Sequence, residues 1–180
     1  MKKTVKAILA EVFSGNAGCL RHISTGKSVV IVIGATNGTE TLVTADDVFS
    51  WIGPDFKNFG CDKVEQPTPD TSVEVYEQVE NADYRKIFSS FGQNLDRLCL
   101  TTPQIKTFVR DHADNYLREE GWAVFLFLFK VRNVETGKDE FFVAHVIRRE
   151  VGDSKVTLSP LSYNNVWSAK RRHRVVVPKL

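Results

Sequence analysis

The stretch TTPQIKTFVRDHADNYLREEGWAVFLFLFKVR, residues 101–132, decides the fold class of this chain. Thr101 and Gln104 have the spacing of a capping box, and Pro103 supplies a fixed φ in the first helical turn. Apolar and aromatic side chains then recur at three-, four- and seven-residue spacing, at Ile105, Phe108, Val109, His112, Tyr116 and Leu117. This periodicity predicts one amphipathic helix over residues 102–120.

Charged residues occupy the other face of this predicted helix. They are Lys106, Arg110, Asp114 and Arg118. Asp114 lies four residues from each arginine, so the spacing predicts that it pairs with both.

A buried strand is predicted directly after the helix. Gly121 offers the left-handed conformation that ends helices, and Lys130 is the only polar side chain in residues 122–131, WAVFLFLFKV. A strand that is apolar on both faces belongs in the interior of a sheet. Three phenylalanines alternate on one face, as they do in some sheets that stack on bases. Because the other face is equally apolar, we interpret them as core.

Further strands and helices are predicted from local patterns. A turn at residues 135–138 returns the chain as an antiparallel strand at 141–147, and later strands are expected at 156–161 and 175–177. Pro160 places the first of these at an edge or a bulge. Earlier in the chain, strands are predicted at 28–33 and 42–43, helices at 44–52, 72–79 and 84–91, and a loop at 55–61.

These elements predict an α+β domain. Its antiparallel sheet is centred on residues 122–131 and packs against the helix at 102–120, with further helices within 44–100. The length of 180 residues suits a single domain over 1–180. Pro67 and Pro69 mark residues 66–72 as the best linker, so an N-terminal subdomain at 1–65 is the alternative division.

Composition places the chain among ordinary globular proteins. Hydrophobic residues make up 42% and charged residues 26%, and the longest apolar run is too short to span a bilayer. The three cysteines are far apart and form no CxxC pair, which indicates free thiols in a reducing compartment. Lys6 and Glu11 interrupt the only stretch that resembles a secretion signal. We therefore predict a cytoplasmic protein.

The net charge of +2 conceals an uneven distribution. Residues 1–39 carry five basic and one acidic side chain, residues 40–120 carry eight and sixteen, and residues 121–180 carry eleven and five. This distribution is typical either of basic ends that fold against an acidic middle or of a polarised surface that attracts an anionic partner.

The basic run near the C-terminus is the most suggestive feature for function. It comprises Lys170, Arg171, Arg172 and Arg174, with Trp167 nearby. Lysine and arginine neutralise phosphates, and a tryptophan stacks on unpaired bases, so this segment is the predicted nucleic-acid site. Other basic residues that would extend it are Arg21, His22, Lys27, Arg148 and Arg149. The alternative is a solvated loop whose charges discourage the pairing of edge strands.

No metal site or cofactor is predicted. The histidines at 22, 112, 145 and 173 lack the spacing that places two ligands on one helix face. The segment Gly26-Lys27-Ser28 resembles the end of a phosphate-binding loop, but Arg21 stands where the first glycine is required. A thiol–histidine pair can be drawn from Cys99 and His112, with Asp111 or Asp114 as the orienting carboxylate.

These observations favour a non-catalytic cytoplasmic binding protein of unspecified partner, with RNA or DNA as the preferred partner of the basic segment. A protein-interaction module or homo-oligomer without nucleic acid is the first alternative, and it would use the acidic segment or an edge strand. A small enzyme with a Cys/His site is the second, because no complete set of nucleophile, base and stabilising group stands out.

Overall fold

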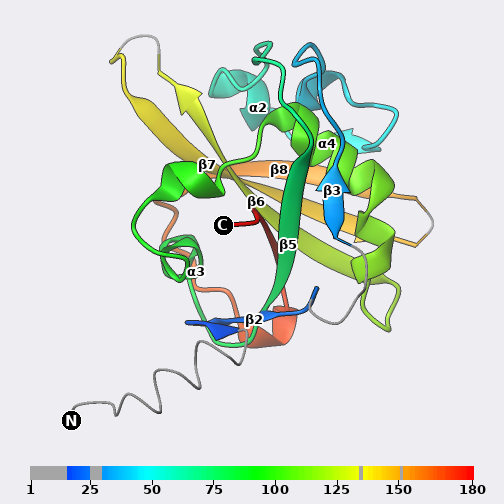
Figure 1. Cartoon of the computed structure of the whole chain (residues 1–180), viewed down its shortest axis with the longest axis vertical. Coiled ribbons are helices and arrows are strands. Elements are labelled where there is room, and N and C mark those ends of the chain that lie inside the picture. Colours follow the sequence, from blue (N-terminus) through cyan, green and yellow to red (C-terminus); the bar gives the residue numbers. More distant parts are fainter. Residues whose placement is uncertain (1–15, 25–29, 134–135, 151) are drawn as a thin grey trace.

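The computed structural model describes residues 16–24, 30–133, 136–150 and 152–180 (Figure 1). Its strands are β1 (Asn16–Ala17), β2 (Leu20–His22), β3 (Ile31–Ile33), β4 (Trp51–Ile52), β5 (Thr71–Gln78), β6 (Trp122–Arg132), β7 (Asp139–Arg149), β8 (Ser154–Pro160) and β9 (Arg174–Pro178). Its α-helices are α2 (Asp55–Asn58), α3 (Tyr84–Ser89) and α4 (Thr102–Asp111). Short 3-10 helices are η1 (Leu42–Thr44), η2 (Leu95–Leu98), η3 (Ala113–Tyr116) and η4 (Ala169–Arg171). The segment Gly26-Lys27-Ser28, the start of the strand predicted at 28–33 and part of the turn predicted at 135–138 lie outside the described residues.

The strands form one mixed sheet. This confirms the predicted α+β class, but the prediction of a purely antiparallel sheet was wrong. Within the described residues the order is β1-β2-β5-β9-β6-β7-β8-β4, and β3 also pairs with β5. The β6–β7 and β7–β8 pairs are antiparallel as predicted, but β9 runs parallel to β6 and β4 runs parallel to β8. The last strand thus enters the middle of the sheet and joins β5 to β6, because the long segment between β8 and β9 carries the chain back across the sheet.

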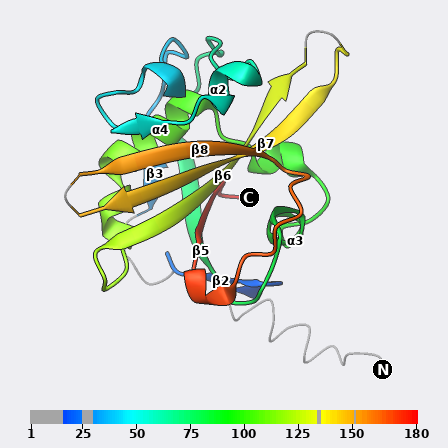
Figure 2. The ribbon, with the colours of Figure 1, turned by 180° about the vertical axis from the view of Figure 1, so that it is seen from behind.

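The sheet is covered on both faces. Phe125, Phe127 and Phe129 pack with α2, α4 and η1 on one face, which we call the α4 face. On the other, the α3 face, Val124 and Leu126 pack with α3 and η2. Figures 1 and 2 show α4 and α3 on opposite sides of β6, β7 and β8. The burial of both sets of β6 side chains confirms that the three phenylalanines belong to the core.

The helix predicted at 102–120 begins as expected but ends early. Thr101 and Gln104 form the capping box in both directions. The α-helix stops at Asp111, because His112 leaves the helical conformation (φ −130°) and its Nε2 lies 3.0 Å from the Val32 carbonyl oxygen. A partner from a distant strand therefore ends the helix almost three turns before the predicted glycine.

The early end also changes the predicted ion pairs. Asp114 contacts Arg148 of β7 at 2.7 Å instead of the two helix arginines. Arg110 pairs with Asp111, and Arg118 pairs with Glu120. On the face that was predicted to be polar, Lys106 is buried, because residues 40–47 cover it and supply Glu40 and Asp47 at 3.0 Å each.

Several predictions for the middle of the chain were wrong. Residues 72–79 form most of strand β5 instead of a helix, and 44–52 form turns and the short strand β4. The strand predicted at 42–43 is the 3-10 helix η1, and the loop predicted at 55–61 contains α2. The helix predicted at 84–91 is confirmed in α3.

The N-terminal strands belong to the same sheet as the rest of the chain. β2 and β3 pair with β5, and β5 pairs with β9. The division at residues 66–72 stays a prediction. No helix in the described residues is long and apolar enough to cross a membrane.

Candidate functional site

The structure separates the basic residues of the C-terminal segment into two groups. Lys170 and Arg171 lie on η4 and are exposed. Arg174 is the first residue of β9 and is buried, with 6% of its surface exposed. Arg172 lies between them and is half-exposed. The four predicted cations therefore do not form one accessible surface.

Arg172 and Arg174 bind the carboxylate of Glu77, together with Arg21. Glu77 lies on β5 opposite Arg174 of β9 and Arg21 of β2, and it is 2% exposed. Arg174 also donates to the Tyr116 carbonyl oxygen at 3.2 Å. We call Glu77 and these three arginines the Glu77 cluster. Burial alone would raise the pKa of Glu77, but the hydrogen bonds from Arg174 and Arg172 outweigh it and hold the pKa below its ordinary value.

Arg172 reaches this cluster through an unusual backbone conformation. It is the only non-glycine residue with positive φ in the described part of the chain, at φ 49° and ψ 47°. The left-handed conformation costs an ordinary residue about 1–2 kcal/mol. Here it ends η4 and accompanies a 2.9 Å ion pair from the Arg172 guanidinium to Glu77.

Trp167 belongs to a group of packed rings on the α3 face of the sheet, opposite the face that carries Glu77. Its ring stacks on His145 at 5.5 Å between centroids and meets the edge of His173 at 5.3 Å. Tyr84 of α3 packs on the same tryptophan. Trp167 also exchanges backbone hydrogen bonds with Ala82, and its carbonyl oxygen accepts one from Gln78 Nε2. The indole is thus a packing element of the α3 face.

Four side-chain polar atoms of this group and of the adjoining Gln78 lack partners among the described residues. Five buried side-chain nitrogen or oxygen atoms have no hydrogen-bond partner in the described residues, and four of them are Gln78 Oε1, His145 Nε2, Trp167 Nε1 and His173 Nδ1. We call these four residues the ring cluster. Burial lowers the pKa of His145 to about 4 and that of His173 to about 3. Both imidazoles are therefore neutral at pH 7.

Cys99 and His112, the predicted thiol–histidine pair, are not brought together. Cys99 packs on the α3 face, whereas the ring of His112 contacts Phe108 on the α4 face. Burial raises the pKa of the Cys99 thiol to about 12, which keeps it protonated and unreactive at pH 7. No group of three or more potential metal ligands occurs among the described residues.

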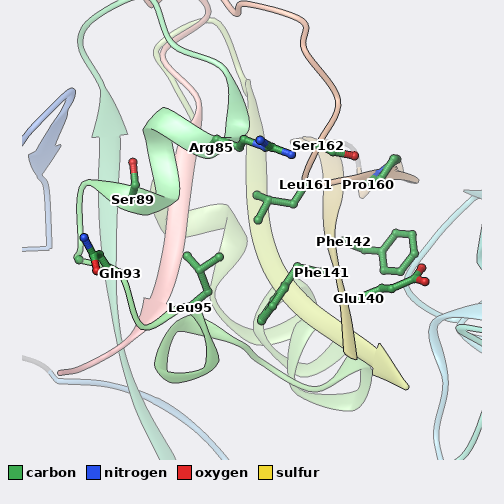
Figure 3. Close-up of a pocket in the computed structure, with 11 residues that line it drawn as sticks. Arg85, Ser89, Gln93, Leu95, Glu140, Phe141, Phe142, Pro160, Leu161 and Ser162 are labelled. Carbon is green, nitrogen blue, oxygen red and sulfur yellow. The ribbon is translucent and has the colours of Figure 1, made fainter. Parts of the chain in front are cut away.

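A pocket of about 550 Å³ lies on the α3 face, between α3 and the neighbouring ends of β7 and β8 (Figure 3). Six of its lining residues are Arg85, Ser89, Leu95, Phe141, Leu161 and Ser162. Leu161 is fixed beside β7, because its backbone N–H donates to the Phe141 carbonyl oxygen at 2.9 Å. The apolar side chains are partly buried, and the polar ones are exposed. The pocket therefore has an apolar floor and a polar rim.

Arg85 is the only cation in the lining of this pocket. Figure 3 shows its side chain reaching across the rim toward Ser162, above Leu161 and Phe141. Within the described residues Arg85 forms neither an ion pair nor a side-chain hydrogen bond. The one acidic residue of the lining, Glu140, lies apart from Arg85 and accepts a hydrogen bond from Asn133 at 2.7 Å.

Sequence reasoning missed this pocket. Its residues come from α3, from the segment after it and from the ends of two strands, and each of them is ordinary in its local context. One sequence feature could have pointed to it. Tyr84, Ile87 and Phe88 have helical spacing and face the core, so Arg85 and Ser89 are directed away from the core.

Comparison of this chain with protein-family models, with curated proteins and with solved structures gave no match. The candidate sites are therefore supported by the structure of this chain alone.

Proposed function

We propose that this chain is a cytoplasmic, non-catalytic binding protein that holds a small apolar ligand in the pocket between α3 and the ends of β7 and β8. The observation that carries the proposal is the pocket itself, at about 550 Å³ with Leu95, Phe141 and Leu161 in its lining. Ligand sites are concave and mostly apolar, with a few polar groups that orient the ligand. This pocket has both properties.

Binding without catalysis is favoured by the chemistry around the pocket. Its lining has no histidine or cysteine, and its polar groups are a guanidinium, a carboxylate, an amide and two hydroxyls, from Arg85, Glu140, Gln93, Ser89 and Ser162. The carboxylate already accepts a hydrogen bond from Asn133, and neither serine has a base within hydrogen-bonding distance among the described residues. Such groups orient a ligand, but they supply no activated nucleophile.

Two-dimensional NMR of the isotope-labelled protein tests this proposal. Titration with a panel of small apolar compounds should give saturable shift changes for Leu95, Phe141 and Leu161, with none for α4 on the opposite face. Leu161→Asp should abolish these shifts, because a carboxylate would stand on the apolar floor, whereas Val166→Asp on the exposed part of the same segment should not. Absence of saturable shifts at the pocket would refute the proposal.

Nucleic-acid binding through the basic C-terminal segment is a second candidate function. Two observations favour it. Lys170 and Arg171 are exposed and form no ion pair among the described residues. The Glu77 cluster also places three arginines on one carboxylate, and two of them, Arg21 and Arg172, are half-exposed. A phosphate backbone is attracted by such an excess of positive charge.

The experiment for this second candidate is fluorescence anisotropy with labelled single-stranded and duplex RNA and DNA at two salt concentrations. The variant to use is Lys170→Ala with Arg171→Ala, since Arg172 and Arg174 hold Glu77 and their loss would change stability as well as binding. We expect uniformly weaker binding and a shallower salt dependence. Unchanged affinity in this double variant would remove the candidate.

A further inference from the structure

We infer that the ligand of the pocket is a carboxylate with an apolar body, and that Arg85 binds its carboxylate group. This inference rests on the proposed function, and it names the chemical class of the ligand. The argument uses the charge, the position and the contacts of Arg85.

A guanidinium beside an apolar floor is suited to an anion. Arg85 lies in the rim, and the described residues offer it no counterion. Arginine binds a carboxylate through two parallel N–H···O bonds, which gives orientation as well as affinity. Ser162 also lines the pocket, and in Figure 3 the Arg85 side chain points toward it, so we place the Ser162 hydroxyl as a second donor to the anion. The pocket therefore positions a charged head group at the rim above an apolar floor.

The balance of charges favours a monoanion. Arg85 is the single cation of the lining, and Glu140 contributes one negative charge to it. A dianionic phosphate would bring two negative charges to a lining that holds one guanidinium and one carboxylate, whereas a carboxylate ligand brings only one. The apolar body would lie on Leu95, Phe141 and Leu161, which are partly buried and remain in contact with the pocket.

Three ligands with the same apolar chain provide the test: octanoate, octan-1-ol and octyl phosphate, each titrated into the full chain and followed by NMR. We expect octanoate to bind about ten times more tightly than octan-1-ol, because hydrogen bonds between two charged groups are stronger than those to a neutral hydroxyl, and solvent at the rim removes part of this gain. Octyl phosphate should bind no more tightly than octanoate.

Variants separate the head group from the apolar floor. Arg85→Gln should remove the preference for octanoate and leave the affinity for octan-1-ol unchanged. Arg97→Gln, an exposed arginine on η2 outside the lining, should change neither affinity and serves as the matched control.

The outcomes distinguish the inference from the proposed function. Equal binding of octanoate and octan-1-ol at the pocket would overturn the inference and leave the apolar pocket in place. Tighter binding of octyl phosphate than of octanoate would also overturn it, in favour of a phosphate head group. Binding of none of the three ligands would refute the proposed function itself.

Discussion

Two neighbouring positions along the β5–β9 pair bury polar side chains in different environments, one charged and one neutral. Glu77 and Arg174 are directed to the α4 face, where the carboxylate is bound by three arginines. Gln78 and His173 are directed to the α3 face, where Gln78 Oε1 and His173 Nδ1, together with one ring nitrogen each of His145 and Trp167, have no hydrogen-bond partner among the described residues. Alternation along the strands places these two environments one residue apart.

The two environments should respond differently to changes in pH. The Glu77 cluster is charged, and three arginines bind its carboxylate, so the removal of one partner leaves a buried charge uncompensated. The ring cluster is stable only while both histidines stay neutral, because a buried imidazolium without a carboxylate partner is costly. After burial, the positive charge of Arg171 lowers the pKa of both histidines, and His145 further lowers that of His173.

Removal of Glu77 should have the largest effect. Glu77→Ala leaves Arg174 buried without its counterion, and we expect a loss of about 3–5 kcal/mol in the free energy of unfolding, measured with urea. If this variant does not fold, Glu77→Gln tests the same pair with less change in shape. The control is Glu80→Ala, which breaks an exposed pair with Lys86 and should cost less than about 1 kcal/mol. A loss below that value for Glu77→Ala would contradict our account of the Glu77 cluster.

The ring cluster should make stability depend on pH in the acid range. Unfolded histidine takes up a proton near its ordinary pKa of 6.5, whereas the folded pKa values are about 4 and about 3. The unfolded state therefore binds more protons as pH falls, and stability decreases with it. Between pH 7.5 and 5.5 we expect a loss on the order of 3 kcal/mol for the two histidines together.

Histidine variants separate this contribution from that of other groups. The double variant His145→Gln with His173→Gln should have a much flatter dependence of unfolding free energy on pH over this range. His112→Gln removes a histidine that lies outside the ring cluster, on the other face of the sheet, and serves as the control. An equal slope in all three proteins would show that the ring cluster does not control acid stability.

The left-handed conformation of Arg172 predicts a smaller change in the free energy of unfolding. Here glycine should be the more stable substitution, whereas alanine is the more stable one at most positions. Arg172→Gly and Arg172→Ala both lose the ion pair to Glu77, but glycine adopts this conformation without strain. The glycine variant should therefore be the more stable of the two by about 1 kcal/mol. At Lys170, within η4, the order should reverse, because there glycine only adds freedom to the unfolded chain. Denaturant titration of the four variants makes this comparison.

The exposed end of the basic segment should matter least for stability. Lys170→Ala with Arg171→Ala removes two surface charges that have no ion-pair partner in the described residues, so we expect a change within about 0.5 kcal/mol. A larger loss would mean that these residues belong to the Glu77 cluster instead of the free surface.

The sequence predicted those features that local chemistry determines. The capping box at Thr101, the apolar strand β6 and its return as β7 depend on neighbouring residues, and the structure contains all three. The end of α4 depends on the carbonyl oxygen of Val32, which the local sequence does not reveal. Residues 72–79 were interpreted as a helix because Ser72 can cap one and Val75, Tyr76 and Val79 have helical spacing. The strand that pairs with them, β9, lies far away in the chain.

The same limit applies to the candidate sites. Arginines of the basic segment have the same local pattern whether they face solvent or bind a buried carboxylate, so Arg171 and Arg174 could not be distinguished by sequence. The pocket was missed because α3, β7 and β8 contribute to it from separate parts of the chain. The missing information was the pairing of distant strands in the first case and the packing of α3 beside β7 and β8 in the second.

The position of β9 between β5 and β6 has a consequence for synthesis on the ribosome. Before residues 174–178 emerge, β5 with its N-terminal neighbours and β6 with β7 and β8 are two half-sheets with no strand between them. Each half exposes an apolar edge to chaperones and to other nascent chains. Folding of the complete sheet therefore requires residues 174–178, and a stalled nascent chain that lacks β9 should be a substrate for quality control.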